Sequence, residues 1–475
     1  MKLSALLREV ETPSAFEDVE IERVTDKFED NLKNSLFICI DGDRFDGHGI
    51  AAKALQNGAV AVVTERDLKL HRQIIVSNTR KAYSLIAANF YGRPAEKLRL
   101  IGITGTNGKT STAYFIKSAL LSMSVKCGLI GTVENDTGAG GKKSVLTTPE
   151  PMELQRLFRE MVDSGCKYCV MEVSSQALSQ ERVYGLHFAA AVLTNITPDH
   201  LDYHGSMEEY INAKLSLFDI SDAAIVNIDD ENNASVLNRI KSPVTTCSAR
   251  LNSADYTAKN AECGTWGVKY EFVGMDCISR MSLKLLGRFN VYNSLCAAAV
   301  CLKLGFELDD ISNAFKQITP VKGRAEIVDI PRDFTVVIDY AHTPDGLQNI
   351  LNCVRELTKG RIITVFGCGG DRDRTKRSTM GEIAGKFSDI AIITSDNPRT
   401  ENPILIINDI LSGMNKSKAK LAVIENRREA IGFALKKARA GDLVLLAGKG
   451  HETYQIIGHE KYPFDEREII KEFTK

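Results

Sequence analysis

The chain has 475 residues, more than one hydrophobic core usually serves, and at roughly 150 residues per domain we expect three domains. Its 60 basic and 61 acidic side chains give a formal charge of −1, which excludes a global field that would draw it to nucleic acid or to a membrane surface. No apolar run approaches the roughly 20 residues that cross a bilayer, and eleven scattered cysteines are typical of a reduced core. We therefore expect a cytoplasmic monomer that binds its partners in local sites.

Strand-like and helical runs alternate along most of the chain, which is the pattern of mostly parallel α/β sheets. Breaks at 91–94 and 320–324, rich in glycine and proline, each precede a strand-like run. We expect a small N-terminal α/β domain over 1–97 and a central domain over 98–328, with a P-loop-type, mostly parallel sheet flanked by helices. A Rossmann-like α/β domain over 329–475 completes the predicted architecture.

A glycine-rich loop follows the first strand-like run of the central domain. Residues 100–103 are LIGI, residues 104–112 are TGTNGKTST, and a helical pattern comes next. Glycines let backbone N–H groups surround an anion, the helix N-terminus adds positive potential, Lys109 can reach the outer phosphates, and Thr110 can offer a hydroxyl to Mg²⁺. Gly102 lies one position too far from Gly108 for the common G-x-x-x-x-G-K spacing, but strand, loop and helix still have the required order. Nucleotide phosphates are predicted to bind Gly105, Thr106, Asn107, Gly108, Lys109, Thr110 and Ser111.

Acids and histidines follow two other strand-like runs. Glu172 lies at the end of VMEV, and His200 lies in DHLDYH at 199–204. Taken alone, such acids are more often helix caps or solvated groups. Zinc is disfavoured because the only C-x-x-C pair, at 166 and 169, has no second pair at zinc spacing. Mg²⁺ prefers oxygen ligands and phosphates, so Glu172 with Thr110 is a candidate magnesium site.

The segment SDNPRTENP at 395–403 follows a strand-like run and is predicted to be an exposed, rigid, charged loop. Two interpretations stay open for this segment alone. It is either a solvated surface turn or a clamp for a charged ligand, in which Arg399, together with Arg372 of GGDRD, binds a carboxylate.

The chain resembles the Mur ligases, the ATP-dependent amide-bond-forming enzymes of peptidoglycan synthesis, and the related folylpolyglutamate synthetases. TGTNGKT is the form that the phosphate loop takes in these enzymes. The resemblance covers roughly 30–460 and rests on further motifs in the same order: TTPEP at 147–151, MEVSSQAL at 171–178, TNITPDHLDYHG at 194–205, AKLSLF at 213–218, LGRFNVYNSLCA at 286–297, GRAE at 323–326, DYAHTPDGL at 339–347, FGCGGDRDRTKR at 366–377, DNPR at 396–399 and AGKGHE at 447–452.

The resemblance implies an enzyme that uses ATP and Mg²⁺ to activate a carboxylate as an acyl phosphate, which an incoming amine then attacks. Within the family DNPR marks the members that add meso-diaminopimelate to UDP-N-acetylmuramoyl-L-alanyl-D-glutamate (UDP-MurNAc-L-Ala-D-Glu). A lysine-adding ligase or a folylpolyglutamate synthetase is the alternative within the same class. A P-loop switch or motor is the alternative from another class, but it would need a guanine motif N-K-x-D or a P-loop-type acidic strand end, and we find neither convincingly in the sequence.

The resemblance also assigns roles to residues. It places Mg²⁺ on Glu172 and His200 and makes Lys214 a carbamate, an anionic oxygen ligand where an ammonium would be repelled. Asn290 and Asn293 are either helix caps or, by resemblance, nucleotide contacts. The full set implied by resemblance is Asn290, Asn293, Arg324, Asp339 and His342 for ATP; Asp43, Arg44, Phe45, Thr147, Thr148, Ser174, Gln180 and Arg182 for the UDP-sugar peptide; and Arg372, Asp396, Asn397, Pro398, Arg399, Gly448 and Glu452 for the incoming amino acid.

Two departures from the family pattern bear on these roles. Lys27-Phe28-Glu29 stands where the family usually has Asp-Ser-Arg, so the uridine contacts must differ in part. Ser395 stands where another Asp is common.

Overall fold

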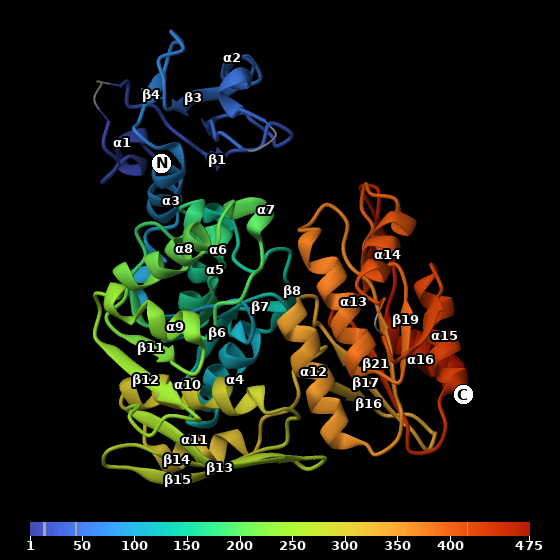
Figure 1. The fold of residues 1–475 in the computed structure, drawn as a ribbon. Coiled ribbons are helices and arrows are strands. Elements are labelled where there is room, and N and C mark those ends of the chain that lie inside the picture. Colours follow the sequence, from blue (N-terminus) through green and yellow to red (C-terminus); the bar gives the residue numbers. More distant parts are fainter. Residues whose placement is uncertain (13–15, 43–44, 416) are drawn as a thin grey trace.

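A computed structural model describes residues 1–12, 16–42, 45–415 and 417–475. It shows three consecutive α/β units, each built on its own main sheet (Figure 1). The N-terminal unit lies at one end of the central unit, and the C-terminal unit lies beside the central unit (Figure 1). The α/β class predicted from the alternating pattern is confirmed.

The N-terminal unit has four parallel strands in the order β1-β2-β3-β4. Its core packs Leu36 and Ile38 of β2 against helix α3, and α3 also packs against α5 of the central unit. Its elements are α1 (Leu3–Leu6), β1 (Arg23–Thr25), β2 (Ser35–Ile38), η1 (Gly47–Ile50), α2 (Ala51–Gln56), β3 (Ala59–Thr64), β4 (Gln73–Ile75), α3 (Thr79–Phe90) and η2 (Pro94–Lys97).

The central unit has eleven strands in the order β15-β14-β13-β12-β11-β10-β5-β9-β6-β7-β8, parallel from β13 to β6 and antiparallel at both edges. Side chains alternate between two cores, with Ile101 facing α4, α10 and α11 and Leu100 facing α5 and α8. The elements are β5 (Arg99–Thr104), α4 (Lys109–Ser122), β6 (Cys127–Ile130), β7 (Glu134–Asp136), β8 (Gly141–Lys143), α5 (Pro151–Asp163), β9 (Tyr168–Glu172), α6 (Ser175–Ser179), β10 (Phe188–Leu193), α7 (Leu201–His204), α8 (Met207–Asp219), β11 (Ala224–Asn227), α9 (Glu231–Ser235), η3 (Leu237–Arg239), β12 (Val244–Ser248), β13 (Tyr256–Gly264), β14 (Gly267–Val273), β15 (Ile278–Leu283), α10 (Phe289–Lys303) and α11 (Leu308–Phe315).

The C-terminal unit has six strands in the order β16-β17-β21-β18-β19-β20, all parallel except β16. Helices cover both faces, since Val337 packs toward α12, α13 and α14 whereas Val336 packs toward α15 and α16. The elements are β16 (Glu326–Val328), β17 (Thr335–Asp339), α12 (Pro344–Leu357), β18 (Ile362–Phe366), α13 (Thr375–Phe387), β19 (Ile390–Ile393), α14 (Pro403–Ser412), β20 (Lys420–Val423), α15 (Arg427–Lys437), β21 (Leu443–Ala447), the hairpin β22 (Tyr454–Ile457) and β23 (Glu460–Pro463), and α16 (Glu466–Thr474).

The start of the C-terminal unit differs from the expected boundary after residue 328. Strand β16 pairs antiparallel with β17, so it belongs to the C-terminal sheet, and the connection between the two larger units lies before Glu326. The sequence gives no sign of this pairing, because β16 is only three residues long (EIV) and shows no recognisable strand pattern.

All eleven cysteines lie in the described ranges, and they are free thiols. Nine are buried, including Cys166 and Cys169, so the prediction of reduced core cysteines is confirmed and the C-x-x-C pair serves packing. None of the helices in the described part of the chain has the length and apolar character needed to cross a bilayer.

Candidate active site

The predicted site residues follow the carboxyl ends of parallel strands in two different sheets. The loops after β5, β9 and β10 of the central sheet face the loops after β17, β18, β19 and β21 of the C-terminal sheet. Two cavities, of about 340 and 250 Å³, lie side by side at this junction and share Asn107, Gly108, Arg324 and Tyr340 as lining residues. A third cavity, of about 270 Å³, lies between the N-terminal and central units.

The phosphate loop joins β5 to α4 as the sequence predicts. Gly105 has φ +139°, and a Cβ there would lie 1.9 Å from Thr194 Oγ1, so only glycine fits. The Lys109 ammonium donates to the carbonyl oxygens of Gly105 (2.9 Å) and Thr106 (2.8 Å). Burial lowers the pKa of Lys109. The loop therefore presents a cation and the first N–H groups of α4 to the 250 Å³ cavity.

Glu172 and Thr110 meet at the end of β9. The Thr110 hydroxyl donates to Glu172 Oε2 (2.9 Å) and accepts from the Arg324 guanidinium (3.0 Å). Thr132, which lies in none of the sequence motifs, donates to Glu172 from its backbone N–H (2.8 Å) and its hydroxyl (2.9 Å). The structure thus brings the predicted carboxylate and hydroxyl together, in a cavity that His200 also lines.

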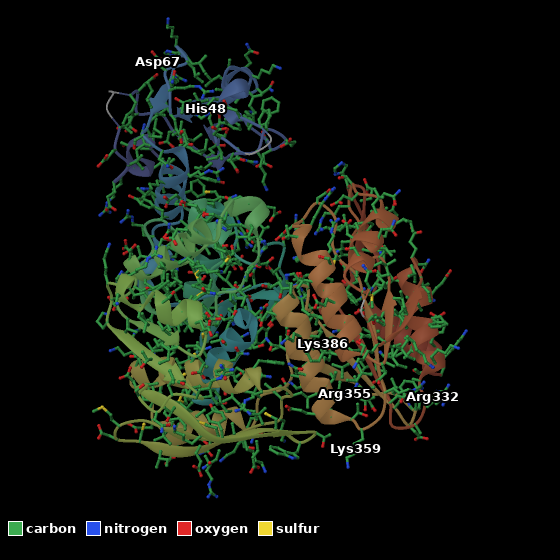
Figure 2. All side chains as sticks on the ribbon, in the orientation of Figure 1. His48, Asp67, Arg332, Arg355, Lys359 and Lys386 are labelled. Atoms are coloured by element: carbon green, nitrogen blue, oxygen red, sulfur yellow. The ribbon has the colours of Figure 1, made fainter. Side chains whose placement is uncertain are left out.

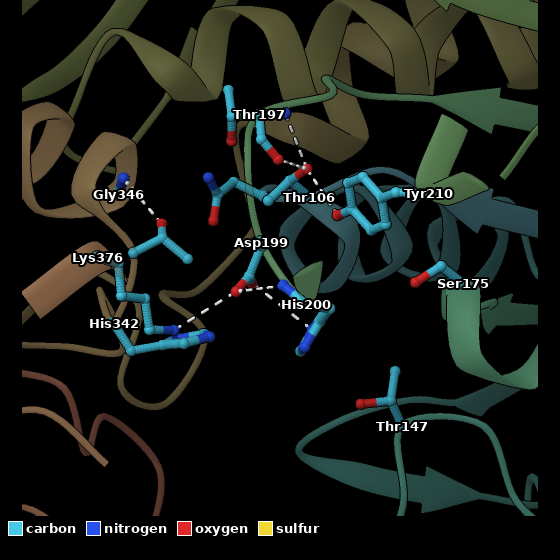
Figure 3. Close-up of polar contacts among 12 residues, drawn as sticks. Thr106, Thr147, Ser175, Thr197, Asp199, His200, Tyr210, His342, Gly346 and Lys376 are labelled. Carbon is cyan, nitrogen blue, oxygen red and sulfur yellow. Dashed lines mark hydrogen bonds and ion pairs between the residues drawn. The ribbon is translucent and has the colours of Figure 1, made fainter. Parts of the chain in front are cut away.

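Asp199 links the two large units beside His200 (Figure 3). Its carboxylate is buried and lies 3.4 Å from the partly buried Lys376 ammonium of α13. Burial alone would raise the pKa of Asp199, but Lys376, His200, His342 and the backbone N–H of His200 together outweigh burial, so the pKa lies well below the usual range. Burial lowers the pKa of His200 to about 4 and that of His342 to about 4, so both imidazoles are neutral at pH 7.

Lys214 lies on α8 directly behind the phosphate loop. Its Nζ donates to Gly105 O (2.8 Å) and lies 4.3 Å from the centroid of the Tyr210 ring. Burial, with the charge of Lys109, lowers the pKa of Lys214 well below its ordinary value. The side chain is therefore held close to the site in a form that loses its proton readily.

Asn290 and Asn293 lie within α10 and do not cap it. The helix begins at Phe289, and Asn290 donates to Leu286 O (2.8 Å) and accepts from Asn293 Nδ2 (3.2 Å). Asn293 lines the 340 Å³ cavity beside Gly108, where a Cβ would lie 2.5 Å from Asn293 Oδ1. The capping interpretation is wrong because the helix starts before both asparagines. Even Arg288, the residue before the first helical residue Phe289, already has helical φ and ψ angles.

Asp339 and Ser111 also line the 340 Å³ cavity. The Asp339 carboxylate accepts from the backbone N–H groups of Ala325 (2.7 Å) and Ala341 (2.8 Å), which fixes the connection between the units. His342 lines the 250 Å³ cavity, and its Nδ1–H donates to Tyr340 O (2.8 Å).

The loop at 395–403 is not the exposed turn that its composition suggests. Asp396, Asn397 and Pro398 are buried because the hairpin β22–β23 covers them. Gln455 donates to Asp396 O (2.6 Å), and the backbone N–H of Ile456 donates to Asn397 Oδ1 (2.9 Å). The solvated-turn interpretation is therefore wrong for the first half of the segment.

The side chains around this loop form a charged lining at one end of the 250 Å³ cavity. Buried Lys449 donates to Asn397 Oδ1 (3.0 Å) and Glu452 Oε2 (2.9 Å). Gly448 has φ +111°, and a Cβ there would lie 2.7 Å from Asp396 Oδ2. Arg399 and Arg372 both line the cavity, and burial together with Arg372 lowers the pKa of Arg399. Two guanidinium groups so close favour an anion between them.

The remaining predicted residues divide between the cavities. Thr147 and Ser174 line the 250 Å³ cavity, and Gln180 and Arg182 line the 270 Å³ cavity together with Asp26, Arg80, Tyr83 and Glu150. Thr148 is buried instead, its hydroxyl donating to Glu172 O (2.9 Å) and accepting from Ser174 N (3.1 Å). Phe45 is 58% exposed, and Asp43 and Arg44 lie outside the described residues.

Lys376, Tyr340 and Thr132 are among the site residues that were not predicted. Lys376 belongs to the quoted GGDRDRTKR motif and could have been found there, and Tyr340 belongs to DYAHTPDGL. Thr132 follows β6 with no motif around it, so only the pairing of β6 with β9 reveals its place.

Family models match three stretches of the chain. They are the Mur ligase family catalytic domain over 32–91, the Mur ligase middle domain over 103–301, and the Mur ligase glutamate ligase domain over 323–450. The chain is 44% identical to the UDP-N-acetylmuramoyl-L-alanyl-D-glutamate–2,6-diaminopimelate ligase of Clostridium botulinum, with all of both chains aligned. The chain belongs to the Mur ligase family.

Other relatives of this Mur ligase carry the same enzyme name. The enzyme of the same name from Caldanaerobacter subterraneus is 48% identical over 92% of this chain and 91% of its own. A solved structure of a ligase with that name covers 100% of this chain and 98% of its own, with a TM-score of 0.68 at 29% identity.

Replacing Lys376 by Gln in this Mur ligase should separate the central and C-terminal units. The change leaves the buried Asp199 carboxylate without its cation, which costs on the order of 3 kcal/mol for a buried pair. We expect a lower melting temperature and a larger radius of gyration by small-angle X-ray scattering. Lys386→Gln is the matched control, because Lys386 lies on the same helix and is exposed (Figure 2). Equal radii for the Lys376 and Lys386 variants would contradict the role of this contact.

Proposed function

We propose that this Mur ligase uses ATP to join UDP-MurNAc-L-Ala-D-Glu to meso-diaminopimelate in the cytoplasm, as a step of peptidoglycan precursor synthesis. The names of its full-length relatives support this substrate pair. The observation that carries the proposal is the 250 Å³ cavity, which Lys109 and Glu172 line from the central unit and Arg372, Arg399 and Glu452 line from the C-terminal unit. A phosphoryl donor and a zwitterionic amino acid can therefore meet in one space.

The two junction cavities fit a nucleoside triphosphate. We place the adenosine in the 340 Å³ cavity, beside Asn293 and Asp339, and the phosphates past Gly108 toward Lys109. Arg324 lines both cavities and lies over the Tyr340 ring at 4.8 Å, so its guanidinium can follow the charge of the phosphates. Ser111, Gly105, Thr106 and Asn107 complete the phosphate contacts in this proposal.

The donor set at the end of β9 fits Mg²⁺. It offers the Glu172 carboxylate, the Thr110 hydroxyl and the neutral His200 imidazole, and Lys214 behind the loop has the lowered pKa that carbamate formation with CO₂ requires. Bound there, Mg²⁺ would neutralise charge on the transferring phosphoryl group. We propose Thr110, Glu172, His200 and carbamylated Lys214 as its ligands.

Side chains of the enzyme stabilise the charges that form during the proposed reaction. The D-glutamyl carboxylate attacks the terminal phosphorus of ATP and displaces ADP. The unprotonated amine then attacks the carbonyl carbon of the acyl phosphate, phosphate leaves, and the nitrogen loses a proton as the amide forms. Lys109 and Arg324 offset the negative charge that gathers during transfer. Neutral His342 and His200 line the same cavity and add no positive charge that would hold the incoming amine away.

The 270 Å³ cavity is our proposed site for the uridine end of the sugar substrate. Arg182 and Gln180 line it, and Thr147 and Ser174 continue from it toward Glu172, so an extended molecule can reach the phosphate loop. Thr148 does not line this path but holds the backbone beside it, through the hydrogen bonds of its hydroxyl to Glu172 O and Ser174 N. The exposed Phe45 ring is available to the uracil.

The C-terminal lining selects the amino acid. Diaminopimelate ends in an ammonium and a carboxylate, whereas lysine ends in an ammonium alone. Arg372 and Arg399 suit the carboxylate, and Asp396 with Glu452 suits the ammonium, while Asn397, Pro398 and Gly448 hold these groups in place. A lysine-adding ligase would gain nothing from the two arginines.

Release of phosphate tests the proposed function directly. Purified protein is incubated with ATP, Mg²⁺ and UDP-MurNAc-L-Ala-D-Glu, and phosphate is measured with meso-diaminopimelate or L-lysine as the amine. We expect kcat/KM to favour diaminopimelate by at least about 100-fold, because lysine leaves the two guanidinium groups that line the cavity without an anion. Equal values would refute the substrate assignment.

Arg399→Lys should raise the KM for diaminopimelate by about tenfold or more with a smaller change in kcat, since a point charge cannot replace a planar fork. Arg428→Lys is the control, because Arg428 is a half-exposed arginine paired with Glu472 on the outer face of the same unit. An unchanged KM in the Arg399 variant would show that Arg399 does not bind the amino acid.

Lys214→Ala should lower kcat by about 100-fold or more, and acetate or formate should restore part of it by occupying the place of the carbamate. Glu208→Gln, an exposed change on the same helix, should have no effect. Full activity in the Lys214 variant would exclude the carbamate.

A further inference from the structure

Two loops that carry the paired arginines are joined along their length. The backbone N–H of Gly370 donates to Asn397 O (2.9 Å), and the Arg399 guanidinium donates to Gly370 O (2.8 Å). A Cβ at Gly370 would lie 1.9 Å from Pro398 O, so the two backbones touch. The distance between the loop that carries Arg372 and the loop that carries Arg399 is therefore set by direct contact.

Both loops contain a residue in the left-handed region at this contact. Asp371 has φ +52° and Arg399 has φ +49°, and neither is glycine. L residues are disfavoured there, so surrounding contacts must hold them. Thr400 donates to the Asp371 carboxylate from its hydroxyl (2.7 Å) and its backbone N–H (3.2 Å), and β22 pairs with Arg399 through Ile456 O (3.1 Å).

A buried ion pair lies beneath this contact. Arg377 of α13 is 1% exposed, and its guanidinium donates to both carboxylate oxygens of Glu401 (2.8 and 3.1 Å). Glu401 also accepts from the backbone N–H of Asp371 (2.6 Å), and Arg377 also donates to Gly369 O (3.3 Å). The pair thus bonds to the backbone of the GGDRD loop on both sides of Gly370. Glu401 itself belongs to the loop that carries Arg399.

Stability alone does not explain this arrangement. A buried ion pair seldom stabilises a fold more than apolar residues of the same size would. Here Glu401 and Arg377 also bond the backbone of Asp371 and Gly369, close to Arg372, and the Glu401 backbone N–H donates to Pro398 O (3.1 Å), next to Arg399. Arg377 has one further bond, to the Asp409 carboxylate of α14 (2.9 Å), and the remaining contacts of the pair lie beside the two residues that carry the guanidinium groups.

We propose that the Arg377–Glu401 ion pair is a positioning element that fixes the spacing of Arg372 and Arg399 and so determines the preference for an amino acid with a carboxylate at its far end. The inference rests on the proposed function. Neither side chain lines the cavity, so neither is a catalytic residue. Loosening the pair lets the guanidinium groups move apart, which weakens binding of a ligand that needs both and leaves a ligand that needs neither almost unaffected.

The test compares amino acids in the full-length enzyme. Glu401→Gln keeps the shape of the side chain and removes its charge. We expect the KM for meso-diaminopimelate to rise about tenfold, with kcat, the KM for ATP and kcat/KM for L-lysine changed less than about threefold. The selectivity ratio should therefore fall about tenfold. A proportional loss for both amino acids, or an unchanged KM, would overturn the proposal.

Two further variants complete the test, one as a control and one as a milder change to the same loops. Arg374→Gln removes a second, exposed cation from Glu401 and should leave the selectivity unchanged. Thr400→Val removes one exposed bond to Asp371 without burying a charge, so it should fold even if Glu401→Gln does not, and the KM for diaminopimelate should rise about threefold with L-lysine unaffected. Unchanged selectivity in Thr400→Val would count against the proposal.

The wild-type protein separates the two claims. If it releases no phosphate with diaminopimelate, the proposed function is wrong. If it prefers diaminopimelate and the variants keep that preference, only the positioning role is wrong.

Discussion

The site depends on one constraint, which is that the carboxyl ends of two parallel sheets face each other across a single junction. Each strand end supplies a loop whose backbone is fixed by the strand before it and the helix after it. The phosphate loop comes from one sheet and the arginine-bearing loops come from the other. The partly buried contact between Lys376 and Asp199 lies between these loops and holds the two sets within one cavity.

Burial at this junction gives ordinary side chains unusual proton affinities. Two histidines with pKa values near 4 are neutral, Lys214 has an amine that loses its proton readily, and Asp199 stays ionised because a cation from the other unit lies beside it. The low dielectric of the buried junction also strengthens the electrostatic interactions of the charged groups that face the cavity. For Asp199, His200 and His342, part of the pKa shift comes from a group on the other unit.

Local sequence was enough to predict the features that are local in the structure. A strand, a glycine turn and a helix in succession identify the phosphate loop, because its geometry is set within about ten residues. Glu172 was predicted to meet Thr110 and does so. The motifs in order along the chain identified the family, and the 250 Å³ cavity contains residues from most of them.

What sequence could not predict depends on contacts between distant segments. The loop at 395–403 is polar enough to be exposed, and only the hairpin that packs over it, about 55 residues later, makes it buried. Asn290 has a residue type that favours a cap, but its place in α10 follows from a helix start fixed by tertiary packing. Thr132 acts through strand pairing that leaves no pattern along the chain, and the motif that contains Thr148 does not show that its hydroxyl bonds the backbone of Glu172.

A structure of the enzyme with a non-hydrolysable ATP analogue, UDP-MurNAc-L-Ala-D-Glu and meso-diaminopimelate would test the shared cavity most directly. We expect the reacting amine within about 3.5 Å of the D-glutamyl carboxyl carbon, with the terminal phosphate beside Lys109 and the far carboxylate between Arg372 and Arg399. Diaminopimelate bound away from those arginines, or a nucleotide whose phosphates do not reach Lys109, would contradict it.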